Sequence, residues 1–369
     1  MSVIILTIDG GGIRGVIPAK ILTQLEQDLG APMHEVVDIL GGTSTGGIIA
    51  LGLSTPNPSN NGSTPFTASQ MLGFYMNDEA SIFVKQSGLD VAEYYSDNGS
   101  GQGIQPWLQQ TIGSTITLSQ AASQVKSLNS NKLSQAFTTS YLLNQDSVNG
   151  NDNNPSDFVY GGPYLFNWSD AKSSTLDDYY VWEAARGTSA APTYFPFAMV
   201  GGGGGNSSAT LRWVVDGGMV ANNPMLFGIS EAFRLNLASS LADITVISLG
   251  TGLYLGASGV NYSSFSDGGN WGTAAWLGEK TSDTDDLDGH ATHPLTNVLS
   301  LSNQISPSLI LNNIMPDQFL RLEPSISFAD SALDGTDTTG LEKIAADFIG
   351  EGGAGNETYN SILDALGGN

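Results

Sequence analysis

Two stretches of sequence decide the fold: VIILTIDGGGIRG at residues 3–15 and ILGGTSTGGIIALGL at residues 39–53. Each passes from a short apolar run, through glycines, into residues with helical character. A short apolar run that ends at glycine is typical of a buried strand, and we predict strands at 3–8 and 35–42. Because a strand, a glycine turn and a helix occur twice in succession, the pattern predicts a parallel α/β sheet.

The same alternation continues along the chain. Further helices are predicted at 16–30, 67–86, 104–112, 179–191, 224–236 and 340–351. Further strands are predicted at 137–143, 163–167, 212–218, 243–252 and 319–324. We find no internal repeat and no clear linker, so we predict a single domain over residues 1–369. Long loops rich in Gly, Asn, Ser or Asp are expected near 54–66, 145–162, 201–209 and 256–294.

Composition excludes several classes of protein. With 369 residues, of which 40% are hydrophobic, the chain can bury a large core and is not a disordered or fibrous protein. The net charge of −24 disfavours nucleic acid as a partner and disfavours strongly anionic membranes. Absence of Cys removes disulfides and thiolate zinc sites, and only 3 His make a multi-histidine metal site improbable. We therefore expect no metal and no cofactor.

The amino-terminal apolar run is too short to span a bilayer, and no basic stretch precedes it. No run of about 18 apolar residues occurs elsewhere. We expect a soluble protein with no transmembrane segment and a cytoplasmic location, while export by a non-classical route stays open.

The segment GGTSTGG (41–47) carries the strongest chemical signal. It fits the pattern G-x-S-x-G between a strand and a helix, with Gly42 and Gly46 on either side of Ser44. Small neighbours allow the sharp turn that exposes a nucleophilic serine, and the adjacent helix N-terminus favours a developing negative charge. The alternative is a glycine-rich turn in which Ser44 only caps the helix.

The segment DGGGIRG (9–15) allows two interpretations. Its spacing of Gly10, Gly12 and Gly15 fits a dinucleotide-binding loop, but the second strand lacks the acidic residue that would hold a ribose. Backbone N–H groups of successive glycines, including Gly11, can instead form an oxyanion hole beside the serine turn. Arg14 is a candidate for binding a phosphate or carboxylate head group, or else a solvated surface residue.

A serine nucleophile needs a base. His34 precedes the second strand, whereas His290 and His293 lie in an irregular stretch, so a Ser-His-Asp triad remains a formal alternative. Asp216 in VVDGGMVANNP (214–224) is the better candidate, because it ends a predicted strand and glycines follow it. Burial would raise its pKa toward that of a useful base. A turn aspartate that accepts backbone N–H groups is the alternative.

The acidic stretch at 283–288 faintly resembles a calcium loop. Its spacing does not fit an EF-hand, because Pro294 stands where a ligating Glu is required. We interpret it as a solvated loop and leave weak ion binding open.

Together these blocks resemble the patatin-like phospholipase family. The matching blocks are DGGGIRG (9–15), GGTSTGG (41–47), AARGTSAAPTYFP (184–196), DGGMVANNP (216–224) and SLGTG (248–252). The resemblance covers roughly residues 3–252. It implies a three-layer α/β/α sandwich with a mostly parallel central sheet, a Ser/Asp dyad and no catalytic histidine.

By position in these motifs, the resemblance makes Ser44 the nucleophile and Asp216 the proton acceptor. The oxyanion hole would be formed by Gly10, Gly11 and Gly12, and Arg14 occupies the family's basic position. The remaining motif glycines are Gly15, Gly42, Gly46, Gly217 and Gly218.

The resulting expectation is a lipid acyl hydrolase of the phospholipase A, lysophospholipase or esterase type, acting through an acyl-enzyme. Its partner would be a lipid or acyl-ester substrate, with a membrane or micelle surface as one setting. Three alternatives are kept: a non-catalytic storage or binding protein, a Ser-His-Asp esterase, and a nucleotide-binding enzyme that uses the first glycine loop.

Overall fold

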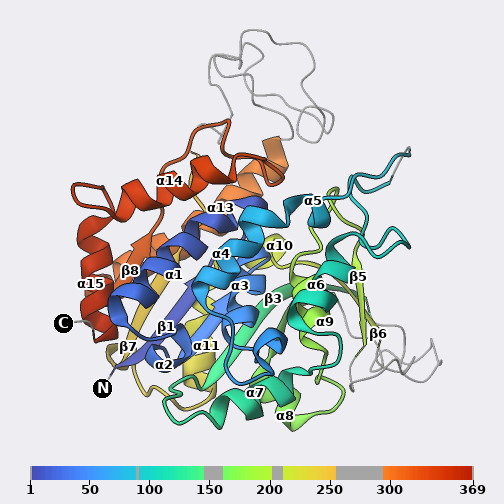
Figure 1. Cartoon of the computed structure of the whole chain (residues 1–369). Helices are drawn as coiled ribbons and strands as arrows, with labels where there is room; N and C mark the ends of the chain where they lie inside the picture. Colours follow the sequence, from blue (N-terminus) through green and yellow to red (C-terminus); the bar gives the residue numbers. More distant parts are fainter. Residues whose placement is uncertain (1, 89–90, 145–160, 202–210, 255–293, 368–369) are drawn as a thin grey trace.

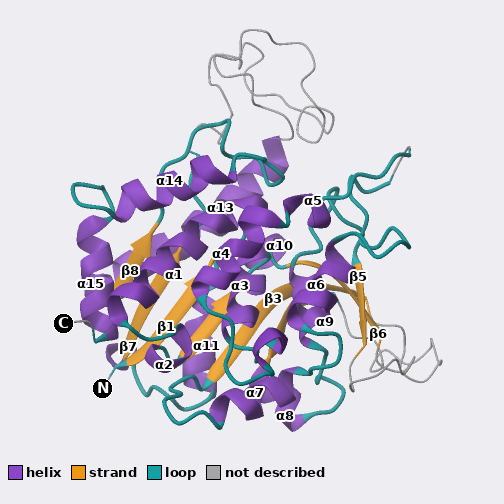
Figure 2. Ribbon diagram, in the orientation of Figure 1, coloured by secondary structure: helices purple, strands orange, loops and turns teal. Residues whose placement is uncertain are grey.

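A central β-sheet organises the structure, a computed structural model that describes residues 2–88, 91–144, 161–201, 211–254 and 294–367. Within these residues the sheet has eight strands, in the order β5-β6-β3-β2-β1-β7-β8, and β4 pairs with β3 outside this path (Figure 2). The strands are β1 Val3–Ile8, β2 Ile39–Gly42, β3 Gln135–Asn144, β4 Gly162–Asn167, β5 Ala198–Gly201, β6 Leu211–Asp216, β7 Ile244–Leu249 and β8 Phe319–Leu322.

Five neighbouring strands, from β3 through β2, β1 and β7 to β8, run parallel. The strands β4, β5 and β6 join them in antiparallel pairs. The sheet is therefore mixed but mostly parallel, as the alternation of strands and helices indicates. Strand β1 holds a central place, paired over its full length with β7, so its amino-terminal apolar run is buried on both faces.

Helices cover both faces of the sheet (Figure 1). Their bounds are α1 Val16–Leu29, α2 Met33–Val36, α3 Thr45–Leu53, α4 Ala68–Asn77, α5 Glu79–Ile82, α6 Ile104–Ile112, α7 Leu118–Lys126, α8 Trp168–Ser173, α9 Val181–Thr188, α10 Gly218–Ala221, α11 Met225–Arg234, α13 Pro294–Ile314, α14 Thr338–Ile349 and α15 Asn356–Leu366. In Figure 1, α1, α3 and α4 lie in front of the strands and α11 lies behind them.

Two hydrophobic cores lie on the two faces of the sheet. Alternate residues of β1 point to opposite sides, so Leu6 and Ile8 belong to the larger core with α1, α3, α4 and α14, whereas Ile5 belongs to the smaller core with α11 and α13. Helix, sheet and helix thus form the three layers of an α/β/α sandwich, which confirms the predicted fold class.

Most predicted elements occur close to their predicted bounds, with two clear differences. The strand predicted at 35–42 is only β2, because α2 occupies Met33–Val36 and Asp38 accepts a hydrogen bond from the Ile4 N–H at 2.8 Å just before the strand. The helix predicted at 67–86 is α4 followed by the short α5. The stretch 54–66 is a loop between α3 and α4, as expected.

The sequence analysis does not predict six helices and one strand of the described residues: α2, α7, α8, α10, α13, α15 and β5. Helix α7 begins with a capping box of Thr117 and Gln120, a readable signal in the sequence. The loops expected at 145–162, 201–209 and 256–294 fall mostly outside the described residues. The prediction of one domain over 1–369 stays a prediction. No helix in the described ranges is both long enough and apolar enough to cross a bilayer.

A buried charge cluster joins the carboxyl ends of β1, β7 and β8. Arg321 donates two hydrogen bonds to the Asp9 carboxylate, at 3.2 and 2.6 Å, and also pairs with Glu323. Burial lowers the pKa of Arg321, but attraction to Asp9 and Glu323 outweighs it and raises that pKa overall. Since Asp9 directly precedes the glycine loop, this cluster anchors the point where that loop leaves the sheet.

Replacement of Arg321 by Met should strongly destabilise the protein. The buried Asp9 carboxylate and the partly buried Glu323 carboxylate would lose their shared cation, and breaking a buried pair typically costs about 3–5 kcal/mol. Urea denaturation measures the change. Lys343→Met is the matched control, because its pair with Asp347 is exposed and its loss should leave the unfolding midpoint unchanged. Equal midpoints for the two variants would contradict the anchoring role of Arg321.

Candidate active site

Ser44 lies on a strained turn between β2 and α3. Its backbone has φ 53° and ψ −122°, a conformation that a non-glycine residue adopts only at a cost of about 1–3 kcal/mol. The turn is tight because its flanking glycines lack side chains. A Cβ on Gly42 would lie 2.1 Å from the Gly46 carbonyl oxygen, and one on Gly46 would lie 2.2 Å from the Ile8 carbonyl oxygen. The glycines of G-x-S-x-G are therefore steric requirements here.

Asp216 reaches Ser44 from the end of β6. The Ser44 hydroxyl donates to Asp216 Oδ2 at 2.7 Å, with no imidazole between them. Strand β3 brings the two residues together, because it pairs with both β2 and β6. Its Thr138 pairs with Gly42 of β2, and its Ser140 pairs with Asp216 of β6. Because β4 takes the opposite edge of β3, β2 and β6 share one edge, and their carboxyl ends meet head to head.

The Asp216 carboxyl is buried, with 5% of its surface exposed. Burial raises its pKa to about 6, although the Gly218 N–H, the Ser44 hydroxyl and the charge of Arg186 oppose the rise. Its Oδ1 accepts the Gly218 N–H at 2.6 Å. Asp216 thus has both an aligned backbone donor and a pKa suited to accepting a proton near neutral pH.

The glycine loop after β1 lies directly against the serine turn, since a Cβ on Gly10 would be 3.1 Å from Ser44 Cβ. Gly10 itself is fully hydrogen-bonded. Its N–H donates to the Asn222 carbonyl at 3.0 Å, and its carbonyl accepts from Asn222 Nδ2 at 3.2 Å and Thr251 Oγ1 at 2.7 Å. Asn222 and Thr251 therefore hold the loop in place.

Gly11 and Gly12 have N–H groups without an acceptor among the residues that the structure describes. Gly12 adopts φ 59°, and a Cβ there would lie 2.1 Å from the Leu333 carbonyl oxygen. Gly11 is equally confined, with Thr251 Oγ1 2.2 Å from its Cβ position. The loop that approaches Ser44 at Gly10 thus has two backbone donors with no acceptor among the described residues, and their role as an oxyanion hole stays a prediction.

Arg14 contacts the protein's own backbone. Its Nε donates to the Gly11 carbonyl at 3.2 Å and its Nη1 to the Gly252 carbonyl at 3.1 Å. These contacts tie the glycine loop to the turn after β7. Binding of a substrate head group by Arg14 stays a prediction.

The other motif glycines also stand at close approaches. A Cβ on Gly15 would lie 2.2 Å from Thr45 Oγ1, and one on Gly217 would lie 2.2 Å from Thr139 Oγ1. At Gly218 the nearest atom is Asp216 Oδ1, 3.0 Å away. Every motif glycine predicted from the sequence is thus gathered around the three strand-end turns.

Of the three histidines, the structure describes only His34. His34 lies in α2, before the amino end of β2, whereas Ser44 follows the carboxyl end of that strand. It is buried, and burial lowers its pKa. His290, His293 and the acidic stretch 283–288 lie outside the described residues. Among the residues described, no group of His, Cys, Asp and Glu is arranged to hold a metal ion.

Sequence reasoning overlooked the residues that position the site: Thr43, Thr139, Thr188, Asn222 and Thr251. Three of them lie inside the blocks 184–196, 216–224 and 248–252, so a signal was present without a role attached. Arg186 of the first block lies in α9 and is also buried, with Nη2 donating to the Pro196 carbonyl at 2.6 Å.

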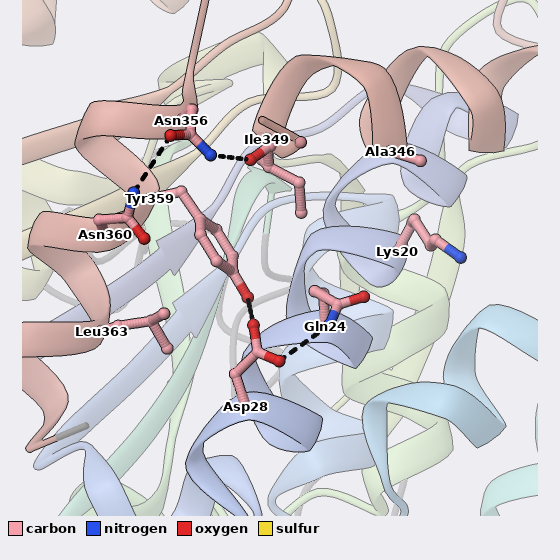
Figure 3. Close-up of a pocket in the computed structure, with 10 residues that line it drawn as sticks. Lys20, Gln24, Asp28, Ala346, Ile349, Asn356, Tyr359, Asn360 and Leu363 are labelled. Atoms are coloured by element: carbon pink, nitrogen blue, oxygen red, sulfur yellow. Dashed lines mark hydrogen bonds between the residues drawn. The ribbon is translucent and has the colours of Figure 1, made fainter. Parts of the chain in front are cut away.

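A separate pocket opens between α1, α14 and α15 (Figure 3). Its polar groups bond to one another: the Tyr359 hydroxyl and Gln24 Nε2 both donate to the Asp28 carboxylate, at 2.6 and 2.9 Å. Neither Ser44 nor Asp216 lines it. It is therefore no part of the candidate active site.

A family model for patatin-like phospholipases matches residues 6–227. The chain belongs to the patatin-like phospholipase family. The matched region includes the glycine loop, the serine turn and Asp216, and it ends before β7 and β8, which complete the sheet. This confirms the resemblance found in the sequence motifs.

Named relatives agree with that family. Patatin-like protein 2 of Arabidopsis thaliana is 30% identical over 298 residues, which cover 74% of this chain and 65% of the relative. Probable inactive patatin-3-Kuras 1 of Solanum tuberosum is 29% identical over 292 residues, covering 74% of this chain and 68% of the relative. The chain thus spans about two thirds of the length of these relatives.

Among solved structures, VipD of Legionella pneumophila has a TM-score of 0.39 at 11% identity, covering 98% of this chain and 66% of that chain.

Replacement of Asp216 by Asn should stabilise the protein at alkaline pH. A carboxyl whose pKa rises from 3.8 to about 6 on folding costs about 3 kcal/mol of stability when it is ionised. That cost is absent below pH 4, grows between about pH 4 and 6, and is constant above. Stability curves should therefore show Asp216→Asn exceeding wild type by about 1–3 kcal/mol at pH 8 and by less at pH 4.5.

Asp347→Asn, at an exposed site, controls for the removal of one negative charge. An Asp216→Asn variant that gains no stability relative to this control at pH 8 would show that the Asp216 carboxyl carries no such cost.

Proposed function

We propose that the protein is a serine carboxylic-ester hydrolase that cleaves fatty-acyl esters of lipids through Ser44 and Asp216. The observation that carries the proposal is the direct hydrogen bond of 2.7 Å between the Ser44 hydroxyl and the buried Asp216 carboxylate. Membership of the patatin-like phospholipase family supports lipid as the substrate class. The activity would be of the phospholipase A, lysophospholipase or esterase type.

In the first half of the reaction, Ser44 Oγ attacks the ester carbonyl carbon while its proton passes to Asp216 Oδ2. The Gly218 N–H, bound to Oδ1, holds the carboxyl plane in place during the transfer. The carbonyl oxygen takes up negative charge in the tetrahedral intermediate. Collapse of that intermediate transfers the proton from Asp216 to the leaving alcohol and leaves an acyl group on Ser44.

The oxyanion acquires its stabilisation from backbone donors. We assign this role to the N–H groups of Gly11 and Gly12, because Gly10 already donates to Asn222. Gly10 contributes by its missing side chain, which lets the loop approach Ser44. Removal of one such donor in comparable sites costs on the order of 10²–10³ in rate.

In the second half, a water molecule gives a proton to Asp216 as its oxygen attacks the acyl-enzyme. The second tetrahedral intermediate expels Ser44 Oγ, which recovers its proton from Asp216, and a fatty acid leaves. One carboxylate therefore serves both halves, which suits its pKa of about 6. This scheme requires no metal and no cofactor.

Three rival functions make different demands. The name of the Solanum tuberosum relative, probable inactive patatin-3-Kuras 1, suggests a non-catalytic protein as one alternative. Such a protein does not require a strained serine that is hydrogen-bonded to a buried carboxylate. A Ser-His-Asp esterase needs His290 or His293 in place of the direct dyad contact. A nucleotide-binding enzyme needs an acidic residue after β2, where the serine turn stands instead.

Ser44→Ala and Asp216→Asn should each lower turnover of a short-chain p-nitrophenyl ester by about 10⁴-fold while the protein stays folded. A fluorophosphonate should label Ser44 in the wild type. His290→Ala and His293→Ala are the controls and should remain within about threefold of wild type, since neither acts in the dyad. An active Asp216→Asn variant together with an inactive histidine variant would replace the dyad with a triad.

The pH dependence of kcat/KM should follow the ionisation of Asp216. Because only the carboxylate accepts the proton, activity should fall tenfold per pH unit on the acid side of an apparent pKa near 6. Above that pH the rate should reach a plateau. A rate profile measured with a substrate that does not itself titrate tests this, and a plateau that persists below pH 5 would contradict Asp216 as the base.

A further inference from the structure

The end of helix α9 contacts the backbones of both dyad residues. The Ser44 N–H donates to Thr188 Oγ1 at 2.9 Å. The Asp216 N–H donates to the Ala190 carbonyl at 3.0 Å, and the Gly217 N–H donates to the Thr188 carbonyl at 3.1 Å. One short segment, residues 188–190, therefore sets the position of the nucleophile and of the base at the same time.

The Thr188 hydroxyl has a fixed orientation. It is completely buried, and it donates its single proton to the Thr139 carbonyl at 2.6 Å. An oxygen whose proton is committed in this way presents a lone pair to the Ser44 N–H. Its methyl group packs on Gly47, where an added Cβ would lie 2.7 Å from Thr188 Cγ2.

A second hydroxyl link reinforces the first. Thr43, which precedes the nucleophile, donates to the Ala221 carbonyl at 2.6 Å and shares a hydrogen bond of 2.6 Å with the Thr139 hydroxyl. Ala221 belongs to α10, the helix that follows Asp216. Buried threonine hydroxyls thus connect the serine turn with strand β3, with the end of α9 and with α10.

We propose that Thr188 is a positioning residue for ester hydrolysis, whose hydroxyl holds the strained Ser44 backbone so that Oγ stays within hydrogen-bond reach of Asp216. The inference rests on the function proposed above and assigns a role to a residue that touches neither substrate nor reacting atoms. Without the hydroxyl, the Ser44 N–H loses its acceptor and the strained turn loses one of its restraints. A misplacement of about 1 Å in such a site can cost about 10² in rate.

The test compares Thr188→Val with Thr188→Ser. Valine keeps the shape and removes the hydroxyl, whereas serine keeps the hydroxyl and removes a methyl group. With a p-nitrophenyl ester, and with active sites counted by fluorophosphonate titration so that unfolded protein does not enter kcat, we expect valine to lower kcat by about 10- to 100-fold with KM within about twofold. Serine should restore kcat to within about threefold of wild type.

Thr23→Val is the matched control, because Thr23 is also buried and also donates its hydroxyl to a backbone carbonyl, that of Ala19, at 2.8 Å in α1. It makes the same chemical change away from the site and should leave kcat per titrated site unchanged. A valine variant at 188 with wild-type kcat would overturn the proposal. Equal losses for valine and serine would also overturn it, since packing and not the hydroxyl would then matter.

The outcome also separates this proposal from the one on which it rests. A folded wild type that neither hydrolyses acyl esters nor reacts with fluorophosphonate at Ser44 overturns both. An active wild type whose Thr188→Val variant retains its kcat overturns only the role of Thr188. If valine prevents folding, Thr188→Cys replaces it: the weak acceptor sulfur should lower kcat below that of serine, and equality with serine would overturn the proposal.

Discussion

Close contact between backbones, at distances that no side chain permits, is the constraint on which the rest of this structure depends. At Gly42 and Gly46 an added Cβ would lie 2.1 and 2.2 Å from a backbone oxygen, and at Gly217 it would lie 2.4 Å from the Thr139 carbonyl oxygen. At Gly10 it would lie 2.5 Å from the side-chain oxygen of Asn222. These contacts bring the ends of β1, β2 and β6 into one small volume. The large two-sided core supplies the rigidity that holds the ends there, because β1 and β2 are buried on both faces.

Rigidity at this edge has an energetic cost that the packing must offset. Ser44 keeps an unfavourable backbone conformation, Asp216 is buried as a carboxyl, and Asp9 lies fully buried beside Arg321. Each would destabilise an isolated segment. They persist because neighbouring groups satisfy them: Thr188 for the Ser44 N–H, Gly218 for the Asp216 carboxyl, and Arg321 for Asp9. Of these three residues, Ser44 and Asp216 are the ones to which we assign chemistry, whereas Asp9 anchors the glycine loop.

Strand direction decides how Ser44 and Asp216, the proposed nucleophile and base, come together. In a fully parallel sheet, two strand ends lie side by side at one edge. Here β6 is antiparallel to β3 and continues along the edge that β2 leaves, so the two carboxyl ends face one another near Thr138 and Ser140. Ser44 and Asp216 therefore face one another along the strand direction. Thr188, at the end of α9, accepts hydrogen bonds from the backbone N–H groups of Ser44 and Gly217.

The sequence by itself determined a parallel α/β sheet and the glycine-flanked serine turn, because apolar periodicity and glycine spacing are local properties of the chain. The family resemblance added the three-layer arrangement and the pairing of Ser44 with Asp216 that we propose as a dyad. The sequence also indicated Asp216 by its place at a strand end. It could not indicate that β6 runs antiparallel to β3 or that the Gly10 N–H donates to the Asn222 carbonyl. Nor could it indicate that Arg321 pairs with the Asp9 carboxylate. The roles of Thr188 and Thr139 were equally hidden. Such contacts join residues far apart in the chain, and only tertiary packing, which balances burial against hydrogen bonding over the whole sheet, selects them.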